Sequence, residues 1–437
     1  MLDIADAALA AADPYRATFR RFSRADSTLF AGDRWYVLSP ECRIFVIGAG
    51  KATYQIAKAV EEVLGSKIHR GLVICKHGQE GALEHIELRL AHHPTPDAAS
   101  LDGARATQEL LRHVRAGDIV VACFTGGSSS LFVGPAGKIN LDDKAEASRV
   151  LLTCGANIKE INDVRKHLST VKGGRLVQPL PPGVRLINLT VSDVIGDAFD
   201  YITDPSFPDR STFADALAVI ERYGLWDRLS ASVIDHLKRG GAIEETCRAD
   251  DLAHLDRNDV LLVTGDAACQ AAAEAARDQG ITPLILSTLF EGESREVGRT
   301  LAAIAKQTTI DGHPVAPPCL LIGGGETTVL FADETKDGMG GPNQEFAVAV
   351  ALEIEGRSDI VALGLDTDGT DGPTPYAGGL VDGTTAAYAR ARSIDLRAAL
   401  ESHDVAPALS ALGDLVITGA TGTNVNDLKL ILVGSPR

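Results

Sequence analysis

The chain has 437 residues, of which 45% are hydrophobic and 23% are charged, and its formal net charge is −17. This length predicts two or three domains, and the composition is that of an ordinary globular protein with a substantial core. The acidic balance excludes the basic stripe that nucleic-acid surfaces need, but a small anion can still bind in a locally positive pocket.

The first twelve residues include Asp3 and Asp6 and no Lys or Arg, so they do not resemble a secretory leader. No apolar run approaches the length of a membrane span. Seven cysteines are scattered along the chain without a Cys-x-x-Cys pair, which indicates buried free thiols in a reducing compartment. We therefore expect a cytoplasmic protein that contacts neither membranes nor nucleic acids.

Short apolar runs alternate with glycine-containing turns and amphipathic stretches, which is the pattern of an α/β protein. The predicted strands are residues 43–47, 71–75, 118–124, 185–191, 259–264, 283–287, 318–322 and 360–365. A parallel or mixed sheet of this kind binds ligands at the carboxyl ends of its strands. We expect a Rossmann-like domain with a parallel sheet at residues 1–245 and a smaller α/β domain at residues 246–437.

The first predicted strand ends in Gly48-Ala49-Gly50-Lys51 and leads into a helix that runs to about Leu64. A helix start attracts anions, and Lys51 adds a full positive charge there. The dinucleotide fingerprint fails because Thr53 stands in place of its third glycine, and the Walker A pattern fails at Phe45 and Ala52. The alternative is a surface lysine after a tight turn.

The third predicted strand is followed by T-G-G-S-S-S, Thr125–Ser130. Its consecutive amides and hydroxyls suit a phosphate, although a helix cap with extra serines explains the same residues.

A basic stretch, Asn162–Leu176, interrupts the acidic chain with Arg165, Lys166, His167, Lys172 and Arg175. At helical spacing Arg165, Ser169 and Lys172 share one face, which can hold a carboxylate or a phosphate with Arg165 as the clamp. A solvated basic face is the alternative.

Carboxylates gather after two predicted strands. Ser192–Asp197 carries Asp193 and Asp197, of which one can bind Mg²⁺ and the other can accept a hydroxyl proton. Asp366, Asp368 and Asp371 form a second group, and Asp-Gly turns are the alternative for both.

Four loops of glycine, amide, hydroxyl and carboxylate residues crowd the last third of the chain. They are Gly323–Thr328, Gly340–Phe346, Asp366–Pro373 and Thr421–Asp427. Such loops expose backbone N–H groups together with hard oxygen ligands, which suits a phosphate with its magnesium ion. Ordinary turns use the same residues, but four such loops in one segment favour a site.

His92 and His93 stand before Pro94-Thr95-Pro96-Asp97. Adjacent histidines project differently, and no further ligand accompanies them at a metal-site spacing. We interpret this stretch as a rigid loop.

Together these motifs resemble the glycerate 2-kinases of the glycerate kinase/MOFRL type, which are often labelled hydroxypyruvate reductases in tartrate-degradation operons. The resemblance runs nearly end to end. It is carried by Gly48–Ala52, His93–Asp97, Thr125–Leu131, Val164–Leu176, Ser192–Asp197, Glu291–Val297, Gly323–Val329, Asn343–Ala347, Thr367–Pro373 and Thr421–Asp427.

The resemblance implies phosphorylation of D-glycerate at its 2-hydroxyl by ATP with Mg²⁺, giving 2-phosphoglycerate, in a cleft between two α/β domains. A homodimer is in keeping with the family. The family's important lysine corresponds to Lys51, and with it we assign catalytic roles to Asp193 and Arg165. Nucleotide or phosphate binding is expected at Gly50, Gly126, Gly127, Ser128, Ser129, Lys172, Gly324, Gly325, Glu326, Thr327, Asn343, Thr423 and Asn424. Metal binding is expected at Asp197, Asp366 and Asp368.

Three departures from the family pattern stand out, of which the first two concern the substrate more than the fold. Pro342 stands where many members have an arginine implicated in the reaction, and Arg165 or Arg175 is the expected stand-in. Asp204 adds a negative charge where small neutral residues are usual, and Ala420 replaces a usual proline. The alternatives are therefore a kinase of a longer hydroxy or sugar acid, an NAD(P)H-dependent hydroxypyruvate reductase, and a binding protein that has lost phosphoryl transfer.

Overall fold

The computed structural model describes residues 1–437 except 80, 193–204, 242–244, 331–337 and 436–437. The chain divides into two compact units. Among the described residues, one unit contains Pro14–Ser192 and the residues from 205 to Leu262, and the other contains Met1–Asp13 and the residues from Val263 onward. The chain's first helix therefore belongs to the same unit as the residues after Leu262.

The first unit is built on a six-stranded sheet in the order β6-β5-β4-β7-β8-β9. Its strands are β4 (Ile44–Ala49), β5 (Ile68–Lys76), β6 (Ile86–Ala91), β7 (Ile119–Phe124), β8 (Arg185–Val191) and β9 (Asp256–Val263). The pairs from β6 through β8 are all parallel. From β4 the chain runs to β5 and β6 on one side of β4, and then to β7 on its other side. Right-handed crossovers therefore place α3 (Thr53–Leu64) and α4 (Ala98–Leu111) on opposite faces of the sheet.

Two additions complete this unit. A short antiparallel meander, β1 (Phe22–Ala25), β2 (Thr28–Ala31) and β3 (Arg34–Val37), follows α2 (Pro14–Arg21). After the short helix α5 (Ser128–Leu131), four helices pack on one another around their own apolar cluster. These four are α6 (Leu141–Thr153), α7 (Ile158–His167), α8 (Phe213–Arg222) and α9 (Ala231–Arg239).

The second unit has a mixed sheet in the order β10-β11-β15-β12-β13-β14. Its strands are β10 (Thr282–Phe290), β11 (Cys319–Gly325), β12 (Ile360–Asp366), β13 (Gly378–Asp382), β14 (Leu415–Val416) and β15 (Asp427–Val433). The last strand, β15, lies between β11 and β12 and is antiparallel to both. The start of β15 therefore meets the ends of β11 and β12 at one edge of the sheet.

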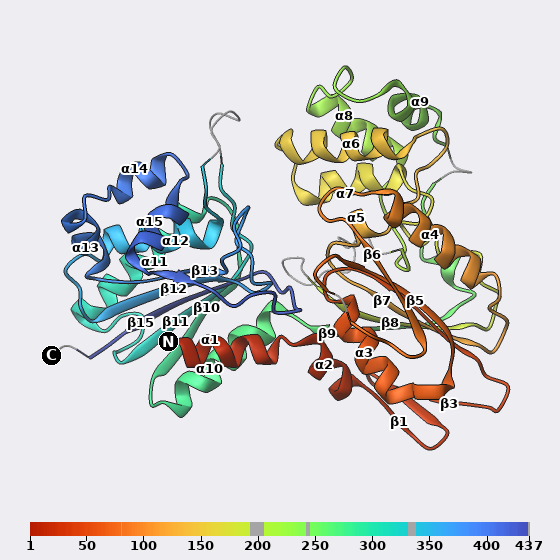
Figure 1. The fold of residues 1–437 in the computed structure, drawn as a ribbon, viewed down its shortest axis with the longest axis horizontal. Coiled ribbons are helices and arrows are strands. Elements are labelled where there is room, and N and C mark those ends of the chain that lie inside the picture. Colours follow the sequence, from red (N-terminus) through yellow and green to blue (C-terminus); the bar gives the residue numbers. More distant parts are fainter. Residues whose placement is uncertain (80, 193–204, 242–244, 331–337, 436–437) are drawn as a thin grey trace. The chain divides into compact units, whose positions relative to one another are not determined.

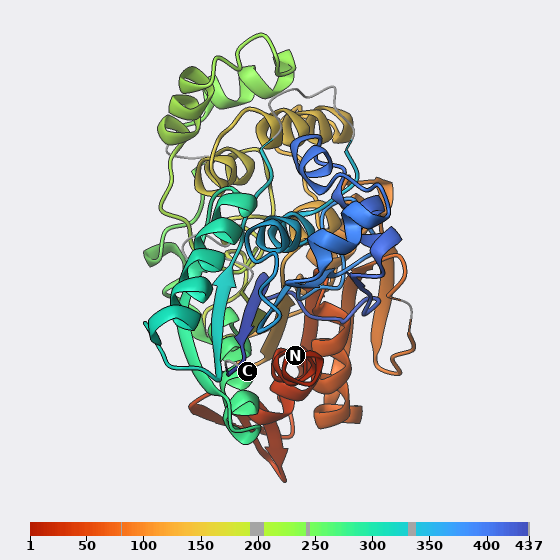
Figure 2. The same ribbon diagram turned by 90° about the vertical axis from the view of Figure 1, so that its left-hand side faces the viewer.

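The helices of the second unit are α1 (Leu2–Ala11), α10 (Gly265–Asp278), α11 (Ser294–Asp311), α12 (Pro342–Glu353), α13 (Thr385–Ala391), α14 (Leu396–Glu401) and α15 (Val405–Leu412). Helix α1 lies against α10 (Figure 1; Figure 2). Helix α12 is buried on all sides, from Asn343 to Ala351. No helix in the described parts of the chain is long and apolar enough to cross a membrane, and all seven cysteines are free thiols, five of them buried.

The eight strands expected from the sequence are confirmed as β4, β5 and β7 to β12, with shifts of a few residues at their ends. The other strands, among them β6 and the central strand β15 of the mixed sheet, were not predicted from the sequence. The α/β class is confirmed, with a parallel sheet in the first unit and a mixed one in the second.

Candidate functional site

Each unit carries a group of predicted site residues at the carboxyl edge of its sheet. In the first unit the turns after β4 and β7 are joined by hydrogen bonds. Lys51 donates its amide to the carbonyl of Gly126 at 2.8 Å, and Ala52 donates its amide to Thr125 Oγ1 at 3.1 Å. The amides of Lys51 and Ala52 at this helix start are thus bonded within the protein.

Glycine is required in both turns. Gly50 has φ 146°, and a Cβ there would lie 2.1 Å from Thr125 Oγ1. Gly127 has φ 86°, and a Cβ there would lie 3.1 Å from Lys51 Cγ and 3.3 Å from His93 Nε2. Lys51, Gly127 and His93, which come from three different turns, are therefore close neighbours at this edge.

The basic stretch does not form one helical face, and that prediction was wrong. Helix α7 ends at His167, because Ser169 forms a β-bridge with Pro135 and the glycines at 173 and 174 adopt positive φ. Its charges nevertheless gather. Burial, followed by the positive charges of Lys172, Arg165 and Arg175, lowers the pKa of the buried Lys144 to about 7. Four cations crowd one region, which is the electrostatic signature of an anion site.

The two arginines of this group differ in their bonding. Arg175 Nη1 donates to the carbonyls of Ser169 at 2.5 Å and Lys166 at 3.2 Å, so it stabilises the turn after α7. Arg165 Nε is buried and has no hydrogen-bond partner, and burial lowers the pKa of its guanidinium. A buried cation with an unsatisfied donor is suited to receive an anionic ligand.

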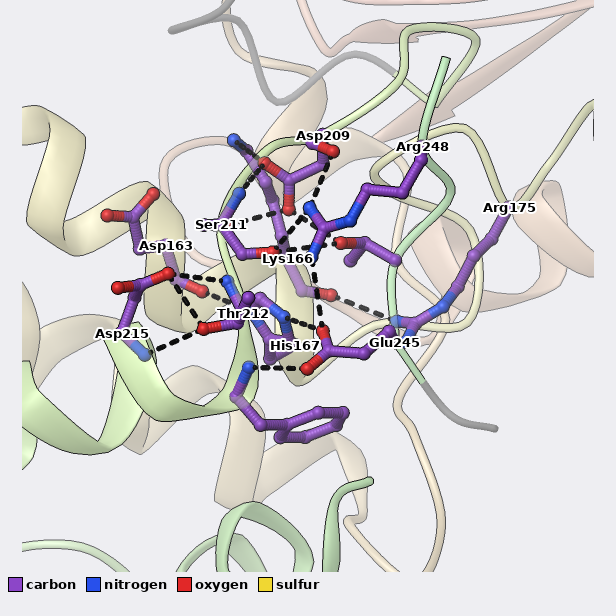
Figure 3. Close-up of polar contacts among 12 residues, drawn as sticks. Asp163, Lys166, His167, Arg175, Asp209, Ser211, Thr212, Asp215, Glu245 and Arg248 are labelled. Carbon is purple, nitrogen blue, oxygen red and sulfur yellow. Dashed lines mark hydrogen bonds and ion pairs between the residues drawn. The ribbon is translucent and has the colours of Figure 1, made fainter. Parts of the chain in front are cut away.

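Lys166 and His167 are paired with acidic residues of the same unit (Figure 3). Lys166 Nζ forms a buried ion pair with Asp209 at 2.7 Å, and Asp209 also accepts from Ser211 and Thr246. His167 Nε2 lies 3.0 Å from Glu245 Oε2. A cavity of about 420 Å³ borders this network along the face of α7 that carries Lys159, Asn162, Asp163 and Lys166. No residue predicted to bind substrate or nucleotide lines it.

In the second unit the register of the mixed sheet builds an acidic edge. Gly325 and Asp366 both pair with Asp427 at the start of β15. Burial, with the negative charges of Asp368 and Asp427, raises the pKa of Asp366 well above its usual range. Burial likewise raises the pKa of Asp371 to about 7. Carboxylates placed so that they repel one another are arranged for a cation.

A hydrogen-bonded network supports this edge. Asp371 accepts from the amides of Asn343 at 3.0 Å and Gln344 at 2.8 Å, which caps the buried helix α12. Asp427 accepts from the amide of Thr327 at 2.9 Å and from Asn343 Nδ2 at 2.7 Å. These hydrogen bonds join Asn343 and Thr327 to the acidic edge at the start of β15.

A buried cation completes the network. Lys429 Nζ donates to Asp427 at 2.7 Å and to Asn343 Oδ1 at 3.3 Å. The sequence analysis did not single out Asp427 or Lys429 as site residues, because the pairing of β15 that places them is a long-range feature.

The remaining predicted site residues take several positions. Thr423 Oγ1 donates to the carbonyl of Ala12 at 2.6 Å, and Asn424 Oδ1 accepts from Asn426 at 3.3 Å, so both hold the loop before β15. Gly324 lies within β11, and Glu326 is exposed just beyond it. Ser128 and Ser129 lie in the short helix α5. Asp193 and Asp197, together with the departure at Asp204, lie outside the described residues.

Pro342 is the first residue of α12, a position that proline favours because the first helical N–H has no partner in any case. Its carbonyl accepts a hydrogen bond from Ser294 Oγ. Proline therefore fits the helix start.

Comparison with known proteins finds two matching domains in the chain. The domain described as "Domain of unknown function (DUF4147)" matches residues 1–238, and the MOFRL family matches residues 319–427. The chain is 38% identical over 435 residues to a glycerate 2-kinase of Pyrococcus horikoshii, covering 98% of this chain and 96% of that one. It is 40% identical over 432 residues to a protein of Agrobacterium vitis provisionally named a hydroxypyruvate reductase, covering 99% and 93%.

Solved structures agree with this result. The crystal structure of a glycerate kinase from Thermotoga maritima superposes with a TM-score of 0.82 at 36% sequence identity, covering 99% of this chain and 98% of that one.

Proposed function

We propose that this chain, which belongs to the DUF4147/MOFRL family of glycerate 2-kinases, transfers the γ-phosphoryl group of ATP to the 2-hydroxyl of D-glycerate. The observation that carries the proposal is the near full-length identity of 38% to a protein named glycerate 2-kinase. The two polar edges support it, because phosphoryl transfer needs mainly positioning and neutralisation of charge.

Two cationic groups of the first unit supply the anion ligands in this proposal: Lys51 at its helix start, and Arg165 with Lys172 beside Lys144. Lys51 stands at a helix start beside Gly127, where its ammonium neutralises charge that develops on the transferred phosphoryl group. Arg165, with its unsatisfied Nε, binds the carboxylate of the acceptor, and Lys172 adds positive charge nearby. Asp193 is the proposed acceptor of the hydroxyl proton.

The acidic edge of the second unit fits a magnesium ion. Mg²⁺ is usually held by one or two carboxylates together with substrate phosphates. Asp366 and Asp368 offer such a pair, since the charge of Asp368 helps to raise the pKa of Asp366. Asp197 is the third proposed ligand. When bound, the ion neutralises phosphate oxygens. The chain's own contribution is to orient two of these carboxylates: Asp366 accepts from the amide of Asp368 at 2.9 Å, and Asp368 accepts from the amide of Thr370 at 2.8 Å. Free thiols suit the cytoplasm as its location.

A reductase is the second candidate because of the name given to the Agrobacterium vitis relative. The turn after β4 argues against it. Thr53 takes the place of the third fingerprint glycine and donates to the carbonyl of Cys123 at 2.8 Å. Strand β5 ends in Lys76 and is followed by His77, where a dinucleotide site has an acid for the ribose.

The test is a coupled assay with ATP, Mg²⁺ and a panel of hydroxy acids, in which enolase without phosphoglycerate mutase reports 2-phosphoglycerate. We expect a signal with D-glycerate. ADP release only with a longer sugar acid would move the substrate away from glycerate. Nucleotide binding without any turnover would indicate a binding protein, and NADH oxidation by hydroxypyruvate would revive the reductase.

Substitution of the two arginines tests the stand-in for the arginine that Pro342 replaces. Arg165→Ala should raise the KM for the acceptor by about tenfold or more, because charge-assisted hydrogen bonds contribute about 1.5–3 kcal/mol. Arg175→Ala should mainly lower thermal stability, since its guanidinium bonds two backbone carbonyls. If neither variant changes the KM, the acceptor is not held by this group.

A further inference from the structure

A second candidate ligand site lies beside Lys51 at the ends of β5 and β6. Lys76 and Ala91 are register partners in this parallel pair, and the amide of His77 donates to the carbonyl of Ala91 at 3.3 Å. The next residues, His77 and His92, are therefore direct neighbours. Their rings lie 4.9 Å apart between centroids, and both are exposed.

Asp97 brings a carboxylate to the same place. Asp97 is the N-cap of α4. Its Oδ1 accepts a hydrogen bond from the amide of Ser100 at 2.9 Å, and Ser100 Oγ accepts one from the amide of Asp97. This capping box fixes the orientation of the carboxylate, as supporting hydrogen bonds do for metal ligands. One ligand atom each from His77, His92 and Asp97 lies within 4.8 Å of the other two.

We propose that His77, His92 and Asp97 form a binding site for a divalent transition ion of the zinc class. Two imidazoles and one carboxylate are the ligands of many sites for zinc and its neighbours, whereas Mg²⁺ prefers oxygen ligands. Ligands bound tetrahedrally at about 2.0–2.1 Å lie roughly 3.3 Å apart. The two exposed imidazoles reach that spacing by rotating about their side-chain torsions. Three protein ligands leave a coordination position open.

The site is linked to the edge that carries Lys51 from two sides. Gln79, two residues after His77, donates its side-chain amide to the carbonyl of Lys51. His93, the residue after His92, is a close neighbour of Gly127 and of the Lys51 side chain. A bound ion would tie together the two segments that flank Lys51. The proposal does not depend on the reaction that the chain catalyses.

The test is calorimetric titration of the whole protein with Zn²⁺ in the presence of excess Mg²⁺, which occupies hard oxygen sites. We expect one strong site in the unchanged protein, and an absorption band in the visible when Co²⁺ replaces Zn²⁺. His77→Ala and His92→Ala should each weaken Zn²⁺ binding by at least about tenfold, the loss seen even for supporting residues of metal sites. Hydrogen exchange should slow in residues 76–79 and 92–97 when Zn²⁺ binds.

Two variants separate ligation from structure. Asp97→Asn keeps the helix cap, since asparagine caps as well as aspartate, yet removes the carboxylate, so it should weaken Zn²⁺ binding at unchanged thermal stability. His113→Ala removes an exposed imidazole elsewhere in the same unit and should bind Zn²⁺ like the unchanged protein. Absence of Zn²⁺ binding, or binding that survives all three ligand substitutions, would overturn the proposal.

Discussion

The charge of the Lys51 side chain is central to the proposed phosphoryl transfer. Loss of one preorganised charge typically lowers turnover by about 10²–10³. We expect Lys51→Ala to show such a loss in the coupled assay at an unchanged melting temperature, because the backbone bonds of the turn do not involve its side chain. Lys67→Ala, at an exposed position in the same unit, is the matched control. Full activity of Lys51→Ala would reduce this residue to a surface lysine.

The positive charges around Lys144 should make the free energy of unfolding depend on pH. Its pKa in the folded protein is lowered to about 7, whereas an unfolded lysine titrates near 10.4. Between these values the unfolded chain binds one more proton, so the free energy of unfolding should rise with pH, by at most about 1.4 kcal/mol per pH unit. Below pH 7 both states are protonated and the dependence ends.

Denaturant unfolding of the unchanged protein and of a Lys144 variant, compared at pH 6 to 10, checks this expectation. Lys144→Met keeps the length of the side chain and removes the titrating group, so the stability difference between the unchanged protein and the variant should rise with pH. Unfolded cysteines titrate near 8.5, whereas burial raises the pKa of Cys75 and Cys269 to about 12 in the folded protein, but this effect is common to both proteins. Parallel curves for the two proteins would show that Lys144 titrates normally.

At the scale of elements, local patterns predicted strands well and long-range pairing poorly. Each strand from β4 to β12 except β6 carries a short apolar run that stands out in the sequence. By contrast, β15 follows the Thr421–Asp427 loop and owes its central place to pairing with β11 and β12, which are distant in the chain. The same limit hid Asp427 and Lys429 from the predicted site.

Helical spacing misled in the basic stretch for a related reason. The residues after His167 have no helix-breaking proline, and the helix ends because Ser169 bridges to Pro135, far away in sequence. Similarly, local motifs do not show that His77 lies beside His92, because the two residues are brought together only by the β5–β6 register. What could be predicted was which loops lie at strand ends, not which side chains meet there.

The turn between β4 and α3 gives a prediction for an element. A Cβ at Gly50 would lie 2.1 Å from Thr125 Oγ1, so Gly50→Ala must displace the turn that presents Lys51. We expect a lower melting temperature together with a large loss of activity. Gly65→Ala is the control, because Gly65 also has positive φ, 51°, with nothing within 4 Å of its Cβ position. It should cost only the conformational term, of order 1–3 kcal/mol for a side chain in this sparsely populated region. Equal effects of the two would rule out the clash.

For the molecule as a whole, the first helix belongs to the unit made from the last third of the chain. Helix α1 buries Ile4, Ala5 and Ala8, lies against α10, and its end is held by Thr423. Deleting residues 1–12 should speed hydrogen exchange in α10 and in residues 421–427, and leave β4 to β8 protected. Ile4→Ala should do the same more mildly, at a cost of about 2–5 kcal/mol. Loss of protection confined to β4–β8 would contradict this assignment.

The central position of β15 has a consequence for synthesis on the ribosome. Strands β11 and β12 leave the exit tunnel well before β15, which lies between them, so their facing edges can be paired only after β15 has emerged. The strands β4 to β8 of the other sheet are free to fold earlier. Strand β15 thus closes the sheet of the unit to which α1 belongs, and nascent chains stalled before Asp427 would expose the unpaired edges of β11 and β12 to chaperones or to each other.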